Sequence, residues 1–248
     1  MRSLFILAVL SSAAVAADLP TIPQESIAKK GDLLFSDDFK NPTADPRWHR
    51  VVDTFTREAG ALKGVQTRDK TVPAADGKPE VPAHPAVYGL ELPTKDSVVE
   101  VKMRFDGATA MDVEFDDRKF TGSHYGHLCR AVLRLDKQQV AILDERDGSQ
   151  SNKLIELKKD ATANKAEISA LQAAHTIAFP AKLEAGKSYD VVVETVGEQM
   201  RVTIDGQPAA YFKSPGIGHE TKSKIEIGVS GKSGYFEDIK VWNATPAK

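Results

Sequence analysis

The sequence predicts an all-β protein, an antiparallel jelly-roll sandwich of two sheets with a short helical insertion. Three observations lead to this prediction. Apolar and polar residues alternate over several short segments, an Asp-Gly pair separates two of these segments, and little helical periodicity lies between them. Of the 248 residues, 41% are hydrophobic and 27% are charged, which is typical of a globular domain and not of a disordered chain.

Strand-like segments account for most of the chain after residue 33. Every second side chain is apolar in residues 97–105, 111–115, 199–205 and 224–229, as in strands with one buried face and one solvated face. Residues 189–196 are almost continuously apolar, which predicts a central strand that is covered on both faces.

Two short features predict how strands turn and bend. Asp205-Gly206 favours a two-residue hairpin, because both central positions of such a turn can require positive φ. The apolar residues fall on even-numbered positions at Phe236 and on odd-numbered positions from Ile239. This shift in the alternation predicts a β-bulge near Asp238.

Two segments interrupt the strands. Residues 69–85 contain four prolines and predict a loop. Residues 151–175 are rich in Ala, Lys, Glu and Leu, with apolar residues on a helical stripe, and predict one or two helices. This insertion either takes part in function or packs on the edge of the sandwich, and the sequence leaves both readings open.

The first residues have the pattern of a targeting segment. Residues 1–16 combine Arg2, an apolar run and a small-residue cleavage site, which predicts a cleaved secretory signal peptide. The apolar run is far shorter than the roughly 20 residues needed to span a bilayer, so we expect no transmembrane segment in the mature chain. We therefore expect an exported protein, periplasmic, cell-surface or extracellular, with a leader at 17–32 and one domain at 33–245.

Charge and motifs exclude several function classes. The 33 basic and 35 acidic residues give a net charge of −2, so nucleic acid is not an expected partner. Glycine-rich phosphate loops are absent from the sequence, as are the common serine-hydrolase and zincin motifs, so no nucleotide is expected either. Cys129 is the only cysteine; it cannot form an intramolecular disulfide, and we expect it to be a small buried hydrophobe.

Three segments resemble a known superfamily. LLFSDDFKNPTADPRWHRV (33–51), GEQMRVTIDGQPAAYF (197–212) and GVSGKSGYFEDIKVW (228–242) are similar to the opening, hairpin and closing strands of concanavalin A-like lectin/glucanase domains. Within that superfamily the chain looks most like secreted bacterial proteins of the 3-keto-disaccharide hydrolase domain family. The resemblance implies carbohydrate as the partner, in a superfamily that includes both glycosidases and sugar-binding proteins.

The first candidate site is a row of acids. Asp112, Glu114 and Asp116 are spaced by two, so all three would project from one face of a strand. Glycoside hydrolysis needs two carboxyl groups, and laminarinase-type glucanases alternate Glu, Asp and Glu on one strand. This chain has Asp, Glu and Asp and departs from that pattern at both catalytic positions. The alternative is an ordinary solvated strand face.

Histidines and arginines follow on the next segments. We predict that His127 acts with Asp112 and Glu114 in acid-base catalysis, and that His124, Tyr125, Arg130, Arg134 and Asp116 contact the sugar. In the alternative interpretation, His124 and His127 belong to a turn, and the two arginines form structural ion pairs with the acids across a hairpin. We expect Glu114→Gln and His127→Ala each to weaken sugar turnover or binding at least tenfold, with little change in melting temperature.

Two further sets of residues are weaker candidates. Asp144, Glu145 and Asp147 could bind a divalent cation such as calcium, which prefers oxygen ligands, or form a solvated turn. Trp48 and Trp242 would stack on sugar rings if exposed and otherwise belong to the core.

The sequence therefore predicts an exported, carbohydrate-interacting protein that hydrolyses a glycoside, a 3-keto glycoside in the finer form of the resemblance, through carboxylate and histidine chemistry. The alternative is a non-catalytic glycan-binding or cell-envelope interaction module on the same scaffold.

Overall fold

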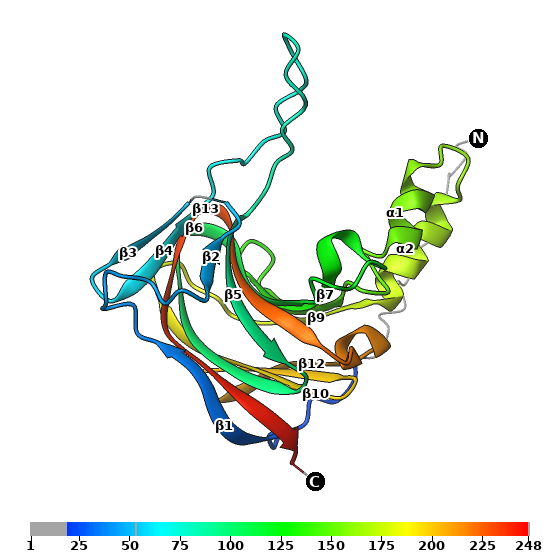
Figure 1. Cartoon of the computed structure of the whole chain (residues 1–248). Coiled ribbons are helices and arrows are strands. Elements are labelled where there is room, and N and C mark those ends of the chain that lie inside the picture. Colours follow the sequence, from blue (N-terminus) through cyan, green and yellow to red (C-terminus); the bar gives the residue numbers. More distant parts are fainter. Residues whose placement is uncertain (1–18, 53, 248) are drawn as a thin grey trace, which may run out of the picture.

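A computed structural model describes residues 19–52 and 54–247 (Figure 1). The predicted signal peptide at residues 1–16 lies outside the described residues. The strands are β1 (Ala28–Asp37), β2 (Trp48–Arg50), β3 (Phe55–Glu58), β4 (Ala61–Val65), β5 (Ala86–Thr94), β6 (Ser97–Asp116), β7 (His127–Arg134), β8 (Gln139–Asp144), β9 (Thr176–Pro180), β10 (Ser188–Val196), β11 (Gln199–Ile204), β12 (Gln207–Lys213) and β13 (Lys222–Pro246).

Two long strands, β6 and β13, pair with each other along nearly their whole length and run through both layers of a sandwich. In the first sheet, the first half of β6 joins β10, β11 and β12, while the second half of β13 joins β1. In the second sheet, the second half of β6 joins β7, β8 and β9, while the first half of β13 joins β5 and β2. Strands β4 and β3 extend from β13 near the point where it bends. The expectation of an all-β, two-sheet antiparallel sandwich is confirmed.

The bend between the layers falls at glycines. Gly107 and Gly231 have φ values of +82° and +98°, and the register between β6 and β13 shifts there. A Cβ at Gly231 would lie 2.5 Å from the Thr109 nitrogen, so the close approach of the two strands requires glycine.

The core fills the space between the sheets. Alternate residues of β6 point inward, among them Met103 and Phe105 from the first sheet and Val113 and Phe115 from the second, all fully buried. Cys129 is buried as predicted.

The outward residues of β6 differ in exposure between the two sheets. Lys102 and Arg104 are partly exposed as predicted, whereas Asp112 and Glu114 are buried, so the expected solvated face at 111–115 is wrong. Neighbouring charged side chains cover these acids.

The predicted turn features are confirmed. Asp205 and Gly206 connect β11 to β12 with φ values of +51° and +76°. A register shift between Glu237 and Lys240, with Asp238 at φ +49°, is the predicted bulge. The segment 189–196 forms β10, which lies between β6 and β11 as a central strand.

The interrupting segments form two projections on the sandwich (Figure 1). The insertion forms α1 (Asn152–Lys159) and α2 (Lys165–Ala174), with Ser151 and Asn164 accepting hydrogen bonds from the first turns as N-caps. These helices lead directly into the edge strand β9. Residues 69–85, predicted as a loop, form most of an exposed irregular ribbon whose isolated bridges pair Val72 with Val81 and Ala75 with Lys78.

The leader forms a strap across the outside of the first sheet. Arg201 on β11 donates hydrogen bonds to the backbone oxygens of Pro23 and Gln24. Glu194 on β10 accepts hydrogen bonds from the Ser26 hydroxyl and the Ile27 amide. Among the described residues, no helix is long and apolar enough to cross a membrane.

Candidate functional site

The outer face of the second sheet carries a layer of charged side chains, here called the charge network. Its members lie on adjacent strands or directly after one, and most are buried although they point away from the core. They are Asp112, Glu114 and Asp116 on β6, Lys224 and Glu226 on β13, His127 and Arg130 on β7, and Glu145 after β8.

Arg130 is at the centre of the network. It lies opposite Glu114 in the β6–β7 register, and its Nη2 donates to Glu114 Oε1 at 3.0 Å. The Arg130 Nε also donates to Glu145 Oε2 at 2.9 Å, and Nη1 lies 4.0 Å from Asp112 Oδ2. Burial alone would lower the pKa of Arg130, but these carboxylates hold it well above its usual value. The predicted pairing of Arg130 with the β6 acids across the hairpin is therefore present, and it gives the sheet a fixed cation.

His127 is held between two carboxylates. Its Nδ1 lies 2.6 Å from Glu114 Oε1 and 3.1 Å from Asp116 Oδ1. Burial lowers the pKa of His127, but the hydrogen bonds to Asp116 and Glu114 outweigh burial and raise the pKa to about 11. A histidine that stays protonated donates hydrogen bonds and cannot accept a proton near neutral pH. The two carboxylates at Nδ1, and the raised pKa that they cause, thus favour His127 as a hydrogen-bond donor over the acid-base role expected from the sequence.

Lys224 continues the alternation of charge on β13. Its Nζ lies 3.0 Å from Asp116 Oδ2 and 2.6 Å from Glu226 Oε1. Acids and bases therefore alternate across β13, β6 and β7, which lets many ionised groups share a buried layer.

Two acids of the network have raised pKa values. Burial raises the pKa of Asp112 to about 6, and the nearby Arg130 offsets only part of this effect. Burial also raises the pKa of Glu145 to about 7, with the neighbouring Glu114 adding to the shift. Two carboxyl groups beside Arg130 thus have pKa values well above the usual carboxyl range.

Glycines on neighbouring strands make room for these side chains. A Cβ at Gly228 would lie 2.4 Å from the Asp112 carboxylate, and a Cβ at Gly89 would lie 2.1 Å from the His49 ring. Both positions fall on the outer face, where any larger side chain would displace a charged neighbour.

The sequence analysis missed a second group on this face. His49 on β2 lies 3.2 Å from Glu91 on β5, and Arg118 donates to Glu91 and contacts the His49 ring. Burial lowers the pKa of His49. With the Arg118 side chain 51% exposed, this group is more accessible than the charge network. Only the long-range pairing of β2, β5 and β13 brings the group beside the network, although Gly89 within an apolar strand was a local sign of a close approach.

The remaining predicted sugar contacts lie outside the network. Tyr125, at φ +50°, is 79% exposed at the tip of the turn, and its ring packs against His124. The His124 ring centroid lies 6.0 Å from that of His127. Arg134 pairs in register with Ala110, four residues along β7 from Arg130.

The three acids predicted to bind a cation have different partners. Asp144 accepts hydrogen bonds from Ser214, Gly216 and the Asp147 amide. Glu145 pairs with Arg130, and Asp147 pairs with Arg146 at 2.6 Å.

Another set of side chains is arranged closely enough to hold a metal. In the part of the chain that the structure describes, Glu114, Asp116 and His127 form the only such group, with ligand atoms within 4.8 Å of one another. Arg130 and Lys224 already neutralise its two carboxylates. A metal would also have to displace the proton that His127 shares with them, so we assign no metal to this group.

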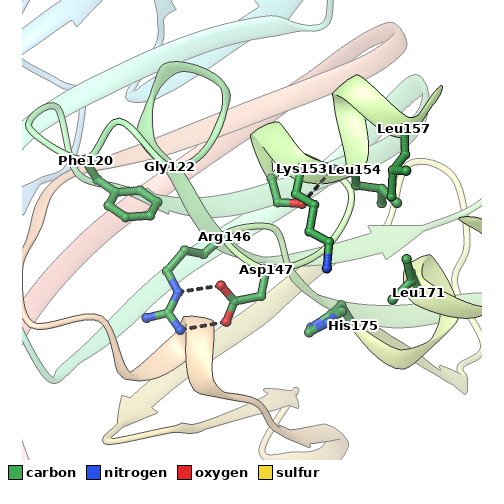
Figure 2. Close-up of a pocket in the computed structure, with 10 residues that line it drawn as sticks. Phe120, Gly122, Arg146, Asp147, Lys153, Leu154, Leu157, Leu171 and His175 are labelled. Atoms are coloured by element: carbon green, nitrogen blue, oxygen red, sulfur yellow. Dashed lines mark hydrogen bonds and ion pairs between the residues drawn. The ribbon is translucent and has the colours of Figure 1, made fainter. Parts of the chain in front are cut away.

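A cavity of about 360 Å³ lies outside the network, at the helical insertion (Figure 2). Its lining comes from the 117–124 loop, the 146–151 loop and the two helices. Neither tryptophan contributes to this cavity or to the network. Trp48 is buried and stacks on Tyr88 at 4.8 Å, and Trp242 lies under the Lys30 ammonium.

Comparison with solved structures shows the fold. A protein of unknown function with a galectin-like fold from Bacillus subtilis matches with a TM-score of 0.58 and 11% identity, over 88% of this chain and 98% of that one. The laminarinase catalytic domain from Thermotoga maritima matches with a TM-score of 0.56 and 12% identity, over 87% of this chain and 99% of that one. A GlcNAcα1-4Gal-releasing endo-β-galactosidase from Clostridium perfringens matches with a TM-score of 0.54 and 13% identity, over 91% of this chain and 65% of that one. No protein-family model matches the chain, and no curated protein does.

Proposed function

We propose that this protein binds carbohydrate on the outer face of the second sheet. The observation that supports the proposal most is the charge network with the adjoining His49, Glu91 and Arg118, a dense two-dimensional array of fixed donors and acceptors. Such an array suits a ligand with many hydroxyl groups, because each hydroxyl both donates and accepts a hydrogen bond. Two proteins with this fold, the laminarinase domain and the endo-β-galactosidase, are named for action on carbohydrates.

Exposure decides which residues touch the sugar. The acids of the network are nearly inaccessible, whereas Arg130 and His127 are partly exposed and the His49–Glu91–Arg118 group is more so. In this proposal the buried acids orient Arg130 and His127, which donate to sugar oxygens. Arg118 and His49 make the outer contacts.

A glycan array followed by isothermal titration calorimetry tests the proposal. Arg118→Ala and His49→Ala should each weaken the affinity for the best glycan about tenfold, since a lost hydrogen bond to a polar ligand costs roughly 1–3 kcal/mol. Arg104→Ala, on the outer face of the first sheet, is the matched control and should bind normally. The proposal fails if no glycan binds, or if both variants bind as tightly as the wild type.

The raised pKa values favour a second, catalytic function at the same place. Glycoside hydrolysis needs one protonated and one ionised carboxyl group, and burial raises the pKa of both Glu145 and Asp112 above the usual carboxyl range. In this second function a substrate has to displace the side chain of Arg130, which lies between the two acids, before Glu145 can act as the acid and Asp112 as the ionised partner. The sequence resemblance makes 3-keto disaccharides the first substrates to test, next to ordinary disaccharides.

A sugar-release assay separates hydrolysis from binding alone. Glu145→Gln should lower the rate by about 10²–10⁴-fold while glycan affinity changes little. Glu156→Gln on α1, an exposed acid, is the control. If the wild type releases no sugar from any substrate that it binds, the protein is a glycan-binding module.

Export belongs to the proposal as well. We infer that the chain is cleaved after Ala16, since residues 14–16 have the small-residue pattern of a signal-peptidase site. The intact mass of the protein recovered outside the cytoplasm should correspond to a chain beginning at Ala17. Recovery of the uncleaved chain from the cytoplasm alone would contradict export.

A further inference from the structure

The ribbon that projects from the sandwich has an apolar face (Figure 1). It begins at the Arg68–His84 bridge and ends in a two-residue turn at Asp76 and Gly77, whose φ values of +50° and +73° suit a tight hairpin. Because side chains alternate between the two faces of a strand, the bridges place four apolar side chains on one face near the tip. They are Val72, Ala74, Pro79 and Val81.

Solvent reaches this face along its whole length. Every residue from 69 to 83 is exposed, with Val72 at 60% and Val81 at 40%. The two backbone hydrogen bonds between these valines, at 2.8 and 3.0 Å, lie in this exposed segment and contribute little net stability. A two-stranded hairpin of this kind is marginal in water unless its apolar face packs against another surface. We therefore expect a partner surface for the ribbon.

The helical insertion also has apolar surface to cover. Its helices have 8 and 10 residues, fewer than the roughly 12–15 at which isolated helices become stable in water. Leu154, Leu157 and Leu171 pack outside the core between the sheets and line the cavity together with Phe120 (Figure 2). At about 360 Å³ this recess has room for several aliphatic side chains, since a cavity of about 150 Å³ already accepts benzene.

The ribbon and the recess are complementary in polarity and in charge. Residues 69–83 contain three acids and two lysines, whereas α1 contains three lysines and one glutamate. One of these lysines, Lys153, lines the recess. An apolar face in a net negative ribbon therefore suits an apolar recess beside a net positive helix.

The two projections are placed so that two copies can exchange them. Figure 1 shows both extending towards the top of the view, away from the first sheet. From its base to its tip the ribbon is about 25 Å long, at roughly 3.3 Å per residue, which is enough to reach a neighbouring molecule. A two-fold axis between two copies would bring each ribbon to the other copy's insertion and close the contact.

We propose that this chain forms a two-fold dimer in which the ribbon of each copy inserts its Val72–Val81 pair into the recess beside the helical insertion of the other copy. One chain supplies both complementary surfaces, so a contact made once is made twice, and both projections become covered. The inference does not depend on the sugar proposal, because the ribbon and the recess consist of other residues than the charge network.

Sedimentation velocity of the full chain over a range of concentrations is the first test. We expect a monomer–dimer equilibrium. Val81→Asp on the ribbon and Leu157→Asp in the recess should each weaken dimerisation at least tenfold, because either places a charge in a buried apolar contact. The matched controls are Thr71→Asp, on the other face of the ribbon, and Ala170→Asp, an exposed position of α2 outside the recess. Both controls should dimerise like the wild type.

Mixing the two defective variants tests the exchange itself. A pair of one Val81→Asp chain and one Leu157→Asp chain keeps one intact ribbon opposite one intact recess, whereas either variant alone keeps no complete contact. Energy transfer between the two labelled variants should show association at concentrations at which each alone is monomeric. Thermal unfolding curves check that the variants are folded, and Leu171→Asp takes the place of Leu157→Asp if that chain is not.

Three results would overturn the inference while leaving the sugar proposal intact. The first is a wild-type chain that stays monomeric up to about 1 mM, which corresponds to a negligible affinity for a specific dimer. The second is a dimer that the ribbon and recess variants weaken no more than their controls do. The third is a mixture of the two defective variants that associates no better than either variant alone.

Discussion

At the scale of single residues, the surroundings of each charged side chain decide its pKa and its hydrogen-bonding role more than the type of amino acid does. The sequence predicted that Glu114 and His127 act on a sugar and that Arg130 contacts it, with ion pairs across the hairpin as the alternative for Arg130. The structure places them in a nearly buried layer in which each contacts at least one of the others. Removing one partner of a buried pair leaves the other charge without compensation, which costs more than the loss of a surface ion pair.

The first prediction concerns Glu114. Glu114→Gln should lower the free energy of unfolding by about 1–3 kcal/mol, because Arg130 and His127 each lose a charged acceptor. This replaces our sequence-based expectation of an unchanged melting temperature. Urea unfolding monitored by circular dichroism measures the effect. Glu156→Gln, at an exposed helix position, should change stability by less than about 0.5 kcal/mol, and equal stabilities of the two variants would contradict the account of the network.

The second prediction concerns pH. The raised pKa values of Asp112 and Glu145 mean that the folded state holds protons that the unfolded state has already released. The stability from these two acids is therefore present at low pH and is lost as pH rises towards 6 and 7. His127 acts in the same direction, because its pKa is raised from 6.5 to about 11 and its contribution falls across that interval. We expect the free energy of unfolding to decrease from pH 5 to pH 8.

Urea titrations at pH 5, 6.5 and 8 test the pH prediction. Asp112→Asn should flatten the profile by about 1.4 kcal/mol, because only the last unit of the Asp112 pKa shift, from pH 5 to about 6, falls within the measured range. Asp136→Asn, at an exposed turn, should keep the wild-type slope. A wild-type profile that is level or rising between pH 5 and 8 would show that these acids are not buried as described.

At the scale of elements, the strap and the helical insertion use the scaffold in different ways. The insertion adds an apolar wall at one edge, whereas residues 23–27 lie on the first sheet through buried polar contacts and the apolar packing of Ile27. The Arg201–Glu194 pair is buried, at 3.2 Å, and both side chains also bond the strap. Glu194, a charged residue within the apolar run of β10, therefore fixes the leader to the first sheet through its hydrogen bonds.

The third prediction tests the strap. Arg201→Leu should destabilise the protein by about 3–5 kcal/mol, because Glu194 and two backbone oxygens lose a buried donor. It should also speed tryptic cleavage at Lys29 and Lys30, which mass spectrometry detects. In a double-mutant cycle, adding Glu194→Gln to Arg201→Leu should cost less than Glu194→Gln alone. Additive effects would mean that the two residues hold the strap independently.

At the scale of the whole molecule, β6 and β13 make the two sheets one cooperative unit. Each long strand contributes to both layers, and the core contains side chains from both. One sheet cannot separate from the other without breaking the central pair of strands.

The fourth prediction is a single unfolding transition. Trp48 is on β2 in the second sheet, and Trp242 is on β13 in the first, so each reports on one layer. The variant Trp48→Phe keeps Trp242 as its single fluorescent tryptophan, and the variant Trp242→Phe keeps Trp48. Within each variant, the fluorescence and circular dichroism midpoints in urea should coincide, as expected for two-state unfolding. A fluorescence midpoint clearly displaced from the circular dichroism midpoint of the same variant would show that the sheets unfold separately.

The sequence by itself determined the local architecture. The alternation of apolar and polar residues predicted the strands, and Asp205-Gly206 predicted the hairpin. The shift in that alternation predicted the bulge at Asp238, and the helical stripe predicted the insertion. Each of these features is set by residues close together in the chain. The β6–β7 hairpin is also local, so the pairing of Glu114 with Arg130 could be foreseen.

Only the tertiary structure decided the composition and charge states of the site. Lys224 and Glu226 reach the β6 acids, and His49 and Glu91 approach them, through pairing between segments far apart in the sequence, which no local pattern encodes. The same pairing buries Asp112 and Glu114, and it is burial, together with the partners it brings, that raises the pKa values of Asp112, Glu145 and His127. A strand pattern gives the face on which a side chain lies, whereas the dielectric environment and the opposing charges depend on the assembled sheet.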